Sequence, residues 1–469
     1  MEGFEMGKVK VLTARQAADL IKDGDTVTLS GFVANGIAEA LNAAAEERFL
    51  ETGHPKDLTL FWVAGTGNKD GSHADHYAHE GMVKKVIGGH FNFVPKICEM
   101  LSENKIEGYN VPQGAIAQML RDNAARKVGT ISHVGIGTFA DPRNGGGRLS
   151  EKTKEDIVKI IELEGQEQLF YPRIPLDVAF IRGTYADELG NITLEKEMAP
   201  LDATSQAMAV HNNGGLVVVQ VERVVKAGHL DPKLVKIPGI YVDAVVECPA
   251  DDPKQSQSIN CTYDPAYAGN TQVPVSSLEP KKLDAKKIIG RRAAMELKKN
   301  VVVNLGVGVP EWVSSVAAEE GVADEMTLTV ECGPVGGVPG GGLRFGGSVN
   351  AQAYMDEGYQ FDFYDGGGLD LCFLGLAEVD NNGDVNVSRL GTRITGSGGF
   401  TNISSNSKKA VFCGTFTNGV KIQTGDGKLT ILEEGKKHKF VNKVTEITFS
   451  GVVAGKAGKD VLYVTERAV

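Results

Sequence analysis

The sequence predicts an α/β protein made of two similar open α/β/α halves with mainly parallel sheets. Short β-branched runs alternate with amphipathic helical patterns along most of the 469 residues, as in parallel α/β units. A strand–glycine loop–helix unit occurs once near the N-terminus and again in the second half, which indicates an internal repeat. The chain is also about three times a typical single-domain length, so more than one domain is expected.

The first copy of the repeated unit begins with the β-branched run Thr26–Leu29, which predicts a strand. A loop over 30–36 with two glycines follows. Apolar residues from Ile37 to Phe49 then recur at helical spacing. The apolar run 58–65 predicts the next strand, so this region is expected to build the parallel sheet of the first half.

The second copy has the same order of elements. Val301–Asn304 predicts a strand, the loop 305–310 follows, and Pro310 precedes a helix that is expected to begin at Glu311. Both predicted helices contain Ala-Ala-Glu-Glu, at 44–47 and 317–320, and the run 326–333 matches 58–65 in pattern and position. We therefore expect the two halves to share one architecture.

Domain boundaries follow from where the periodicity stops. We assign 1–250 to the N-terminal half, 251–285 to a linker and 286–469 to the C-terminal half. The linker is rich in Pro, Asp, Ser, Gln and Lys and lacks helical or strand periodicity. The N-terminal half carries an insertion around 145–175, in which the charged stretch 150–163 predicts a helix.

Composition excludes several classes of protein. Hydrophobic residues make up 42% and charged residues 23%, as in soluble globular proteins, and the net charge of −11 argues against a nucleic-acid partner. The six cysteines form no CxxC pair, which favours reduced thiols. The N-terminal segment is polar, and no apolar run reaches the ~18 residues of a membrane span. We expect a cytoplasmic protein with no membrane association.

Histidines at 73, 76 and 79 raise the question of a metal site. On a helix, side chains at i, i+3 and i+6 would fan over roughly 120°, too wide for one ion without ligands from other elements. A polar helix face or loop is therefore favoured, and we expect no metal. The chain also lacks a G-x-S-x-G elbow, which argues against a triad hydrolase.

Nucleotide-binding fingerprints are absent from the sequence. Gly306 and Gly308 are followed by Val309-Pro310-Glu311, so the third glycine of G-x-G-x-x-G is missing, and no P-loop motif occurs. The loop still offers backbone N–H groups at a helix start, and it is equally consistent with a tight strand-to-helix turn.

Glu331 stands at the end of an apolar strand and is followed by many of the 58 glycines. A carboxylate surrounded by backbone that can approach closely is a candidate covalent nucleophile. The first half has Val63 in the equivalent place, so only the second half would be catalytic. The alternative is that Glu331 is a helix cap or a surface acid.

Several motifs taken together resemble the class I CoA-transferases, and among them the propionate and acetate CoA-transferase branch. The motifs lie in the same order along essentially the whole chain: Thr-Val-Glu-Cys-Gly at 329–333 with the glycines at 336 and 337, Asn-Leu-Gly-Val-Gly-Val-Pro at 304–310, Val-Pro-Gln-Gly at 111–114, Asp-Pro-Arg-Asn-Gly-Gly-Gly at 141–147, and Asp-Gly-Gly-Gly-Leu-Asp at 365–370.

The resemblance implies the CoA-transferase fold with an active site between the halves, and Glu331 as the nucleophile. CoA would move between a short-chain acyl-CoA and a free carboxylate such as propionate, acetate or lactate, by ping-pong kinetics through a glutamyl-CoA thioester. An ordinary Glu ionises near 4.3, so such a nucleophile needs no activating base at neutral pH. No further cofactor is implied, and we expect a homo-oligomer.

The resemblance also assigns roles to other residues. The oxyanion would be held by the amide of Gln113 and a backbone N–H of the Gly398-Gly399 pair, although Gln113 could also be a plain helix-start residue. The pantetheine of CoA would be held by the loop that contains Asn304, Gly306, Val307, Gly308 and Val309.

Two departures from the family pattern stand out. Relatives commonly have Ser where this chain has Cys332, and they continue for a further segment past the equivalent of Val469. An acyl-CoA hydrolase on the same scaffold and a non-catalytic acyl-CoA-binding protein are the competing functions. The second leaves the acid at 331 in only one half unexplained.

Overall fold

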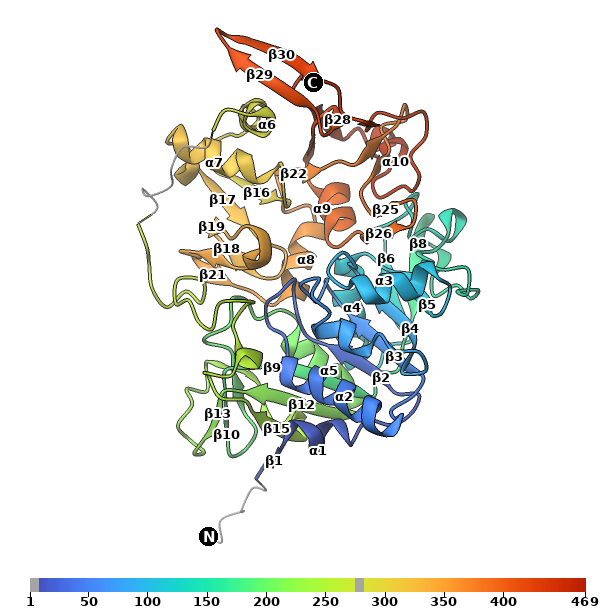
Figure 1. Cartoon of the computed structure of the whole chain (residues 1–469), viewed down its shortest axis with the longest axis vertical. Coiled ribbons are helices and arrows are strands. Elements are labelled where there is room, and N and C mark those ends of the chain that lie inside the picture. The colour runs from blue at the N-terminus through green and yellow to red at the C-terminus, as the bar shows by residue number, and fades with distance from the viewer. Residues whose placement is uncertain (1–7, 275–281) are drawn as a thin grey trace.

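The computed structural model describes residues 8–274 and 282–469, which form two α/β halves stacked along the long axis of the molecule (Figure 1). Each half contains one large open sheet with helices on both faces, and the predicted fold class is confirmed. The described residues include no helix that is both long and apolar enough to cross a membrane.

The sheet of the N-terminal half has eight strands in the order β1-β15-β12-β9-β2-β3-β4-β5, and all neighbours pair in parallel. Its strands are β1 (Lys10–Leu12), β2 (Thr26–Leu29), β3 (Leu58–Trp62), β4 (Val83–Gly88), β5 (Glu107–Asn110), β9 (Val178–Arg182), β12 (Leu216–Val221) and β15 (Ala244–Glu247). β3 and β9 are buried at every position, as expected for parallel strands covered on both faces.

Helices cover this sheet according to the alternation of its side chains. On one face, Val178 and Phe180 of β9 pack with α1 (Ala14–Ala18), α2 (Glu39–Thr52) and α3 (Pro95–Ser102). On the other face, Ala179 and Ile181 pack with α4 (Gln113–Ala124) and α5 (Ala203–Asn212). The second group belongs to a hydrophobic cluster that continues into the C-terminal half.

The sheet of the C-terminal half has seven strands in the order β21-β18-β17-β16-β22-β27-β32. Strands β17 to β32 in this order pair in parallel, whereas β18 and β21 are antiparallel to their neighbours. Its strands are β16 (Val301–Leu305), β17 (Met326–Thr329), β18 (Pro334–Val335), β21 (Ala353–Tyr354), β22 (Leu371–Gly375), β27 (Lys409–Cys413) and β32 (Asp460–Val464).

Helices lie on both faces of this second sheet. α6 (Ala285–Ala294) and α7 (Glu311–Glu319) pack on one face. α8 (Glu357–Asp365) and α9 (Phe400–Asn406) pack on the other, and α8 also contacts α4 of the N-terminal half. α10 (Gly451–Lys456) precedes β32. Because α4, α5, α8 and α9 share one hydrophobic cluster, the two halves meet through a common core.

The internal repeat is confirmed by the strand order. β2 lies between β9 and β3, and β16 lies between β22 and β17. The order β15-β12-β9-β2-β3 in the first half corresponds to β32-β27-β22-β16-β17 in the second. The halves diverge beyond β3 and β17, where the first continues in parallel and the second turns antiparallel.

The helix predicted over 150–163 is wrong. This region ends in strand β7 (Lys159–Leu163), which forms an antiparallel sheet with β8 (Gln166–Pro172) and β6 (Gly129–Ser132). The β-branched residues before Leu163 favour a strand, and Glu164 and Gly165 have the positive φ angles of 50° and 75° that a two-residue hairpin turn requires. The charged residues that suggested a helix lie in the turns before β7.

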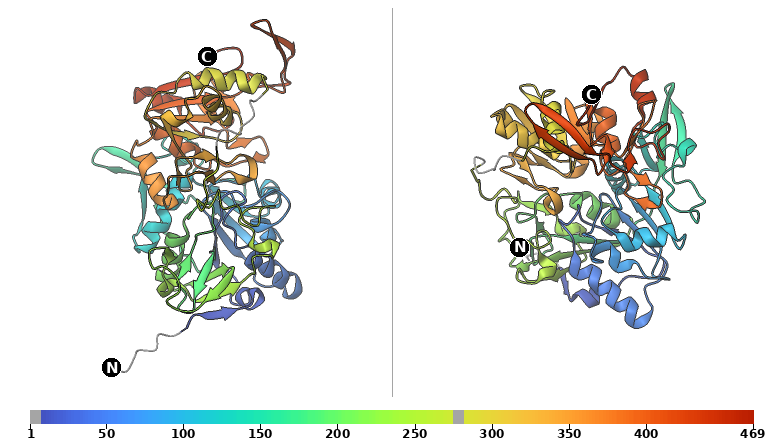
Figure 2. Two further views of the ribbon diagram at one scale, coloured as in Figure 1. Left: turned by 90° about the vertical axis from the view of Figure 1, so that its left-hand side faces the viewer. Right: turned by 45° about the horizontal axis from the view of Figure 1, so that its top comes forward.

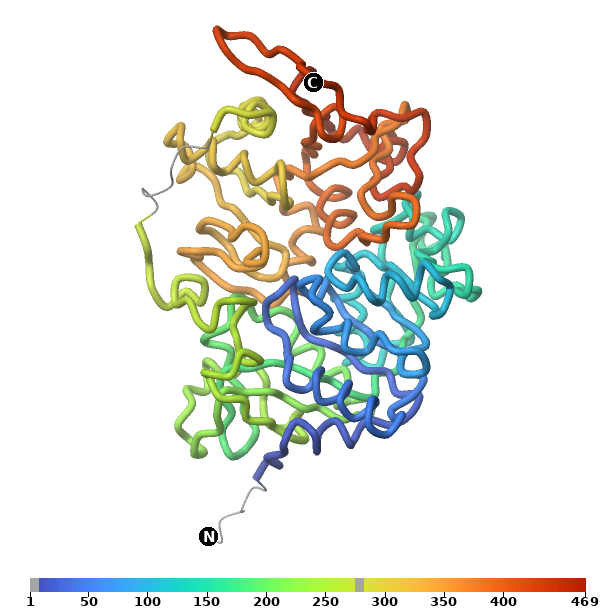
Figure 3. The backbone as a smooth tube through the Cα atoms, in the orientation of Figure 1, coloured from blue at the N-terminus to red at the C-terminus, as the bar shows by residue number. Residues whose placement is uncertain are grey.

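The first part of the predicted linker packs against both halves of the molecule (Figure 3). Ser258 forms a bridge with Asn35, and its hydroxyl donates to the Leu343 carbonyl at 3.2 Å. The Tyr354 hydroxyl donates to the Tyr267 carbonyl at 3.0 Å. Residues 275–281 of this segment lie outside the described residues.

Each half also contains small sheets that are separate from its large sheet. In the N-terminal half, β13 (Arg223–Val225), β10 (Tyr185–Asp187), β11 (Ile192–Thr193) and β14 (Val235–Ile237) form a four-stranded sheet. The C-terminal half has the pairs β19 (Val338–Pro339) with β20 (Ser348–Val349), β23 (Glu378–Val379) with β24 (Val385–Asn386), β25 (Arg389–Leu390) with β26 (Arg393–Ile394), β28 (Thr417–Asn418) with β31 (Lys437–His438), and β29 (Lys421–Gly425) with β30 (Lys428–Glu433). The β29–β30 hairpin projects from the molecule (Figure 2).

Candidate active site

Glu331 lies two residues beyond β17, at the carboxyl end of the parallel part of the second sheet. Ligands of open α/β sheets bind at this edge. The side chain is buried, with 7% of the residue exposed. The backbone turns sharply after it, because Gly333 has a φ of 135° and a Cβ there would lie 2.2 Å from the Met355 carbonyl oxygen. The glycine therefore permits the turn that places Glu331 inside the molecule.

Asn304 on the neighbouring strand β16 holds one side of the Glu331 carboxylate. The strand register places Asn304 opposite Thr329, and its Nδ2 lies 3.5 Å from Glu331 Oε2. The Tyr364 hydroxyl donates to Thr329 Oγ1 at 2.8 Å and completes this polar cluster. Within the described part of the chain, Asn304 Oδ1 is buried without a hydrogen-bond donor, so it can accept from a bound molecule.

Burial changes the ionisation of Glu331 from the ordinary value assumed in the sequence analysis. Removal from water raises the pKa of Glu331 to about 7, and the backbone N–H and Asn304 offset only part of this effect. The carboxylate is thus partly protonated at neutral pH. When ionised, it is poorly solvated, which favours attack on a carbonyl carbon.

Gln113 and the Gly398–Gly399 pair come from different halves and meet at this site. The Gln113 backbone N–H donates to the Gly398 carbonyl at 3.1 Å. A Cβ on Gly398 would lie 3.4 Å from Gln113 Oε1, and a Cβ on Gly399 would lie 3.5 Å from Glu331 Cγ. The structure therefore brings these three predicted oxyanion residues together with Glu331.

The two glycines differ in what their N–H groups do. The Gly398 N–H donates to the Gly89 carbonyl at 2.7 Å and is therefore used in the fold. Among the described residues, no acceptor is paired with the Gly399 N–H. Of the two backbone donors, the Gly399 N–H is the one available to a bound oxygen.

The start of α4 is capped by the opposite half. α4 begins at Gln113 after Pro112 and has no side-chain cap of its own. Its first two N–H groups donate instead to the Gly398 carbonyl and, at 3.1 Å from Gly114, to Asn402 Oδ1. Asn402 Nδ2 in turn donates to the half-buried Asp365 carboxylate at 3.0 Å. The position of Gln113 therefore depends on the contact between the halves.

The predicted CoA loop leaves β16 at the same sheet edge as Glu331. Gly306 is anchored by its N–H, which donates to the Phe373 carbonyl at 2.8 Å. Gly308 has a φ of 93° and its N–H donates to Glu311 Oε1 at 2.7 Å, so this loop is also a tight strand-to-helix turn. Val307 is 53% exposed at the tip, and Val309 is half-buried.

Cys332 directly follows the candidate nucleophile. Its thiol is buried and donates to the Gly346 carbonyl, with 2.9 Å between Sγ and the oxygen. Burial raises the pKa of this thiol well above its ordinary value, so it stays protonated as a donor. The cysteine thus retains a local hydrogen bond to the glycine-rich segment.

Four polar residues near the site carry no motif and were not predicted. Glu357 accepts from Gln113 Nε2 at 2.5 Å, Asp202 lies against Glu357, and Asn402 caps α4. His90 is a fourth: its ring lies beside Gly398, and burial lowers the pKa of this histidine to about 4. These residues come together only when the halves pack, so no local sequence signal marks them.

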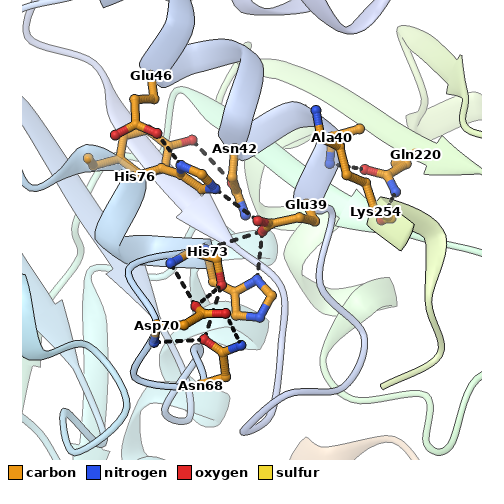
Figure 4. Close-up of polar contacts among 12 residues, drawn as sticks. Glu39, Ala40, Asn42, Glu46, Asn68, Asp70, His73, His76, Gln220 and Lys254 are labelled. Atoms are coloured by element: carbon orange, nitrogen blue, oxygen red, sulfur yellow. Dashed lines mark hydrogen bonds and ion pairs between the residues drawn. The ribbon is translucent and has the colours of Figure 1, made fainter. Parts of the chain in front are cut away.

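The three histidines at 73, 76 and 79 form a ladder with two glutamates of α2. Glu39 lies between the rings of His73 and His76, with 2.6 and 2.8 Å to their nearest nitrogens (Figure 4). Glu46 contacts the other nitrogen of His76 and, at 2.7 Å, His79. Within residues 8–274 and 282–469, no group of His, Cys, Asp or Glu side chains is arranged to hold a metal ion.

The known proteins that this chain resembles in sequence are described as CoA-transferases. A family model described as Coenzyme A transferase matches residues 11–248. Acetate CoA-transferase YdiF of Escherichia coli (strain K12) is 44% identical over 467 residues, which cover 99% of this chain and 87% of that protein. Caffeate CoA-transferase of Acetobacterium woodii is 43% identical over 465 residues, which cover 98% of this chain and 88% of that protein.

Solved structures agree with these relatives. The acyl-CoA transferase YdiF apoenzyme from Escherichia coli O157:H7 superposes with a TM-score of 0.93 at 43% identity and covers 98% of this chain and 87% of that one. A thioester complex of the same protein with CoA gives a TM-score of 0.92, with the same identity and coverage.

Proposed function

The chain belongs to the family I CoA-transferases, enzymes that transfer coenzyme A, and we propose that it exchanges CoA between a short-chain acyl-CoA and a free short-chain carboxylate of the acetate, propionate and lactate kind. The observation that carries this proposal is the buried Glu331 at the meeting point of Asn304, Gly399 and Gln113. A CoA thioester complex is known for the similar protein YdiF.

The first half-reaction begins with attack of a Glu331 carboxylate oxygen on the thioester carbonyl of acyl-CoA. Collapse of the tetrahedral intermediate breaks the C–S bond and gives an acyl-glutamyl anhydride and CoA thiolate. The thiolate then attacks the Glu331 carbonyl, which releases the free acid and leaves a glutamyl-CoA thioester. The acceptor carboxylate reverses these two steps and leaves with CoA, so no redox or metal cofactor is needed.

Each of these additions places negative charge on a carbonyl oxygen. The Gly399 N–H and the Gln113 amide are the donors that we assign to this oxyanion. The Gly306–Val309 loop is assigned to the pantetheine, because it leaves the strand beside Glu331 at the same sheet edge. Binding of the remote parts of CoA can then stabilise the transition state at the thioester.

Incubation with acyl-CoA alone tests the covalent step. We expect one equivalent of free acid per active site and a protein heavier by one CoA less water, measured by intact-mass spectrometry. Continued release of acid without an acceptor would instead identify a hydrolase. Initial rates with both substrates varied should follow ping-pong kinetics.

Variants of Glu331 test the identity of the nucleophile. Glu331→Asp retracts the carboxylate by about 1.5 Å and should slow exchange on the order of a hundredfold or more, because misplacement of about 1 Å has that effect. Glu331→Gln should form no CoA adduct. Glu325→Gln, at the other end of β17, is the matched control and should form the adduct like the wild type. A Glu331→Ala enzyme that still exchanges CoA at a near wild-type rate would contradict the mechanism.

A further inference from the structure

Two further buried carboxyl groups lie next to the candidate site, where one of them contacts Gln113. Glu357 is the first residue of α8 in the C-terminal half, and Asp202 precedes α5 in the N-terminal half. They are 1% and 5% exposed. The Glu357 backbone N–H donates to the carbonyl of Leu201, the residue before Asp202, at 3.0 Å, and among the described residues both Asp202 carboxylate oxygens are buried without a hydrogen-bond donor.

This geometry requires a proton between the two carboxyl groups. Ser205 lies against Asp202, but its hydroxyl donates to the Asp202 backbone carbonyl at 3.0 Å. A hydroxyl has one proton, so Glu357 is the remaining neighbour that can donate to the Asp202 carboxylate. Two buried carboxylates in contact repel each other, and one shared proton converts that repulsion into a hydrogen bond.

The same Glu357 carboxyl fixes the amide of Gln113. Gln113 Nε2 donates to Glu357 Oε1 at 2.5 Å, which leaves the second Glu357 oxygen for the proton shared with Asp202. The Gln113 amide is thereby turned so that its Oε1 faces Gly398. A primary amide has two N–H donors, and this contact uses one of them.

We propose that the Asp202–Glu357 pair is a positioning device for Gln113: one shared proton holds Glu357 as a neutral acceptor, and this acceptor fixes the amide so that its second N–H is free for the oxyanion. This inference rests on the proposed function, in which Gln113 is an oxyanion donor. Glu357 acts through Gln113 and has no contact of its own with the reacting atoms.

The electrostatic surroundings support a proton on the pair at neutral pH. Burial raises the pKa of Asp202 to about 7, with the Asp356 charge in the same direction and Glu357 and Arg121 opposing it. Burial, together with the charges of Asp202 and Glu331, raises the pKa of Glu357 well above its ordinary value. The pair therefore holds a proton at neutral pH, where two ordinary carboxyl groups would both be ionised.

Two substitutions of Glu357 separate this role from that of a charged residue. Glu357→Gln has an oxygen that accepts from Gln113 and an N–H that donates to Asp202, so it should retain at least a third of the wild-type kcat. Glu357→Leu offers neither group and should lower kcat by about tenfold or more with little change in KM. Asp362→Asn is the control, because Asp362 lies on the same helix and pairs with Arg121 at 2.6 Å.

A double-mutant cycle tests whether Glu357 works through Gln113. If it does, the enzyme with both Gln113→Ala and Glu357→Leu should be no slower than Gln113→Ala alone. Multiplied losses in the double variant would overturn the proposal, and so would a Glu357→Gln enzyme as slow as Glu357→Leu. A wild-type enzyme without CoA exchange would instead overturn the proposed function.

The pH profile of kcat gives a readout that a purely structural residue would not move. Loss of the shared proton at high pH leaves two repelling carboxylates, so wild-type kcat should fall on the alkaline side. Glu357→Gln cannot lose that proton and should lack the fall. This comparison also applies if Glu357→Leu does not fold, and an identical alkaline limb in the wild type and Glu357→Gln would contradict the proposal.

Discussion

Glu331 combines two requirements that oppose each other. A nucleophilic carboxylate must be ionised, yet the site that positions it removes it from water, and this burial raises its pKa to about 7. A change from the ordinary value to 7 corresponds to about 3 kcal/mol that the ionised side chain costs the folded protein. Active sites commonly carry such a conflict between stability and activity.

The first prediction concerns this cost. A group whose pKa is raised by folding stabilises the native state below its unfolded pKa, near 4.5, and that contribution is lost as the pH rises through about 7. Glu331→Gln cannot ionise, so it should be more stable than the wild type at pH 8, by up to about 3 kcal/mol. The two proteins should be similar near pH 5. Denaturant titrations at both pH values measure the difference.

Sequence reasoning could find Glu331 but not its supports. An acid at the end of an apolar strand stands out locally, as does Asn304 in a glycine-containing loop motif. Glu357 and Asp202 lie in stretches without any motif, and they are buried only because α8 meets the segment before α5. Such residues become visible when the halves are packed against each other.

At the scale of elements, β-branched strands followed by glycine loops were predictable in both halves, because propensity and burial agree there. The helix predicted for the insertion was wrong because the charged residues around 151–156 suggest a helix, whereas the β-branched residues of β7 form a strand. The turn at Glu164 and Gly165 was the signal for a hairpin.

The histidine ladder is an element-scale feature that ties α2 to the 3₁₀ segment His73–Tyr77. His76 contacts carboxylates through both ring nitrogens, whereas a neutral imidazole has only one N–H. Burial lowers the pKa of His76, but Glu39 and Glu46 outweigh this effect and raise it. Burial also disfavours the charged form of Glu39, which raises the pKa of this carboxyl group. His73 and His76 outweigh the effect of burial and lower the pKa of Glu39 to about 2.

The second prediction follows from the signs of these shifts. The contribution of His76 is present below pH 6.5 and lost as the pH rises through its raised pKa, while that of Glu39 is present above pH 4.5 and lost only toward pH 2. His76→Gln should therefore destabilise the protein most between about pH 4.5 and 6.5, by about 1–3 kcal/mol.

Thermal unfolding across pH 5 to 9 measures this effect. His54→Gln serves as the control, because His54 pairs with Asp23 at an exposed site. It should change the melting temperature little at any pH. A His76→Gln protein whose destabilisation stays constant from pH 5 to pH 9 would show that the ladder does not hold a proton.

At the scale of the whole molecule, the candidate site exists only because two similar halves pack together. Gln113 comes from the N-terminal half, and Glu331 and Gly399 come from the C-terminal half. Because of the repeat, the parts of the two halves that meet at the site have the same strand order. The hydrophobic cluster shared by α4, α5, α8 and α9 keeps the two halves in contact. The repeat was readable from the sequence, whereas the contacts between its copies were not.

The last prediction concerns the contact that fixes the two halves at the site. Asn402 accepts from the Gly114 N–H and donates to the half-buried Asp365 carboxylate, so its amide joins the start of α4 to α8 and α9. Asn402→Ala leaves both groups without this partner and should destabilise the protein by about 2–4 kcal/mol. It should also lower kcat for CoA exchange, because Gln113 follows the start of α4.

Ser404→Ala is the matched control for this variant. Ser404 is buried on the same helix, and the one hydrogen bond of its hydroxyl within the described ranges goes to the Thr401 carbonyl of that helix, at 3.5 Å. It should retain both the wild-type kcat and most of the stability. Denaturant unfolding and exchange assays on the two variants separate the possibilities. If Asn402→Ala lost stability but kept the wild-type kcat, the contact would hold the halves together without positioning Gln113.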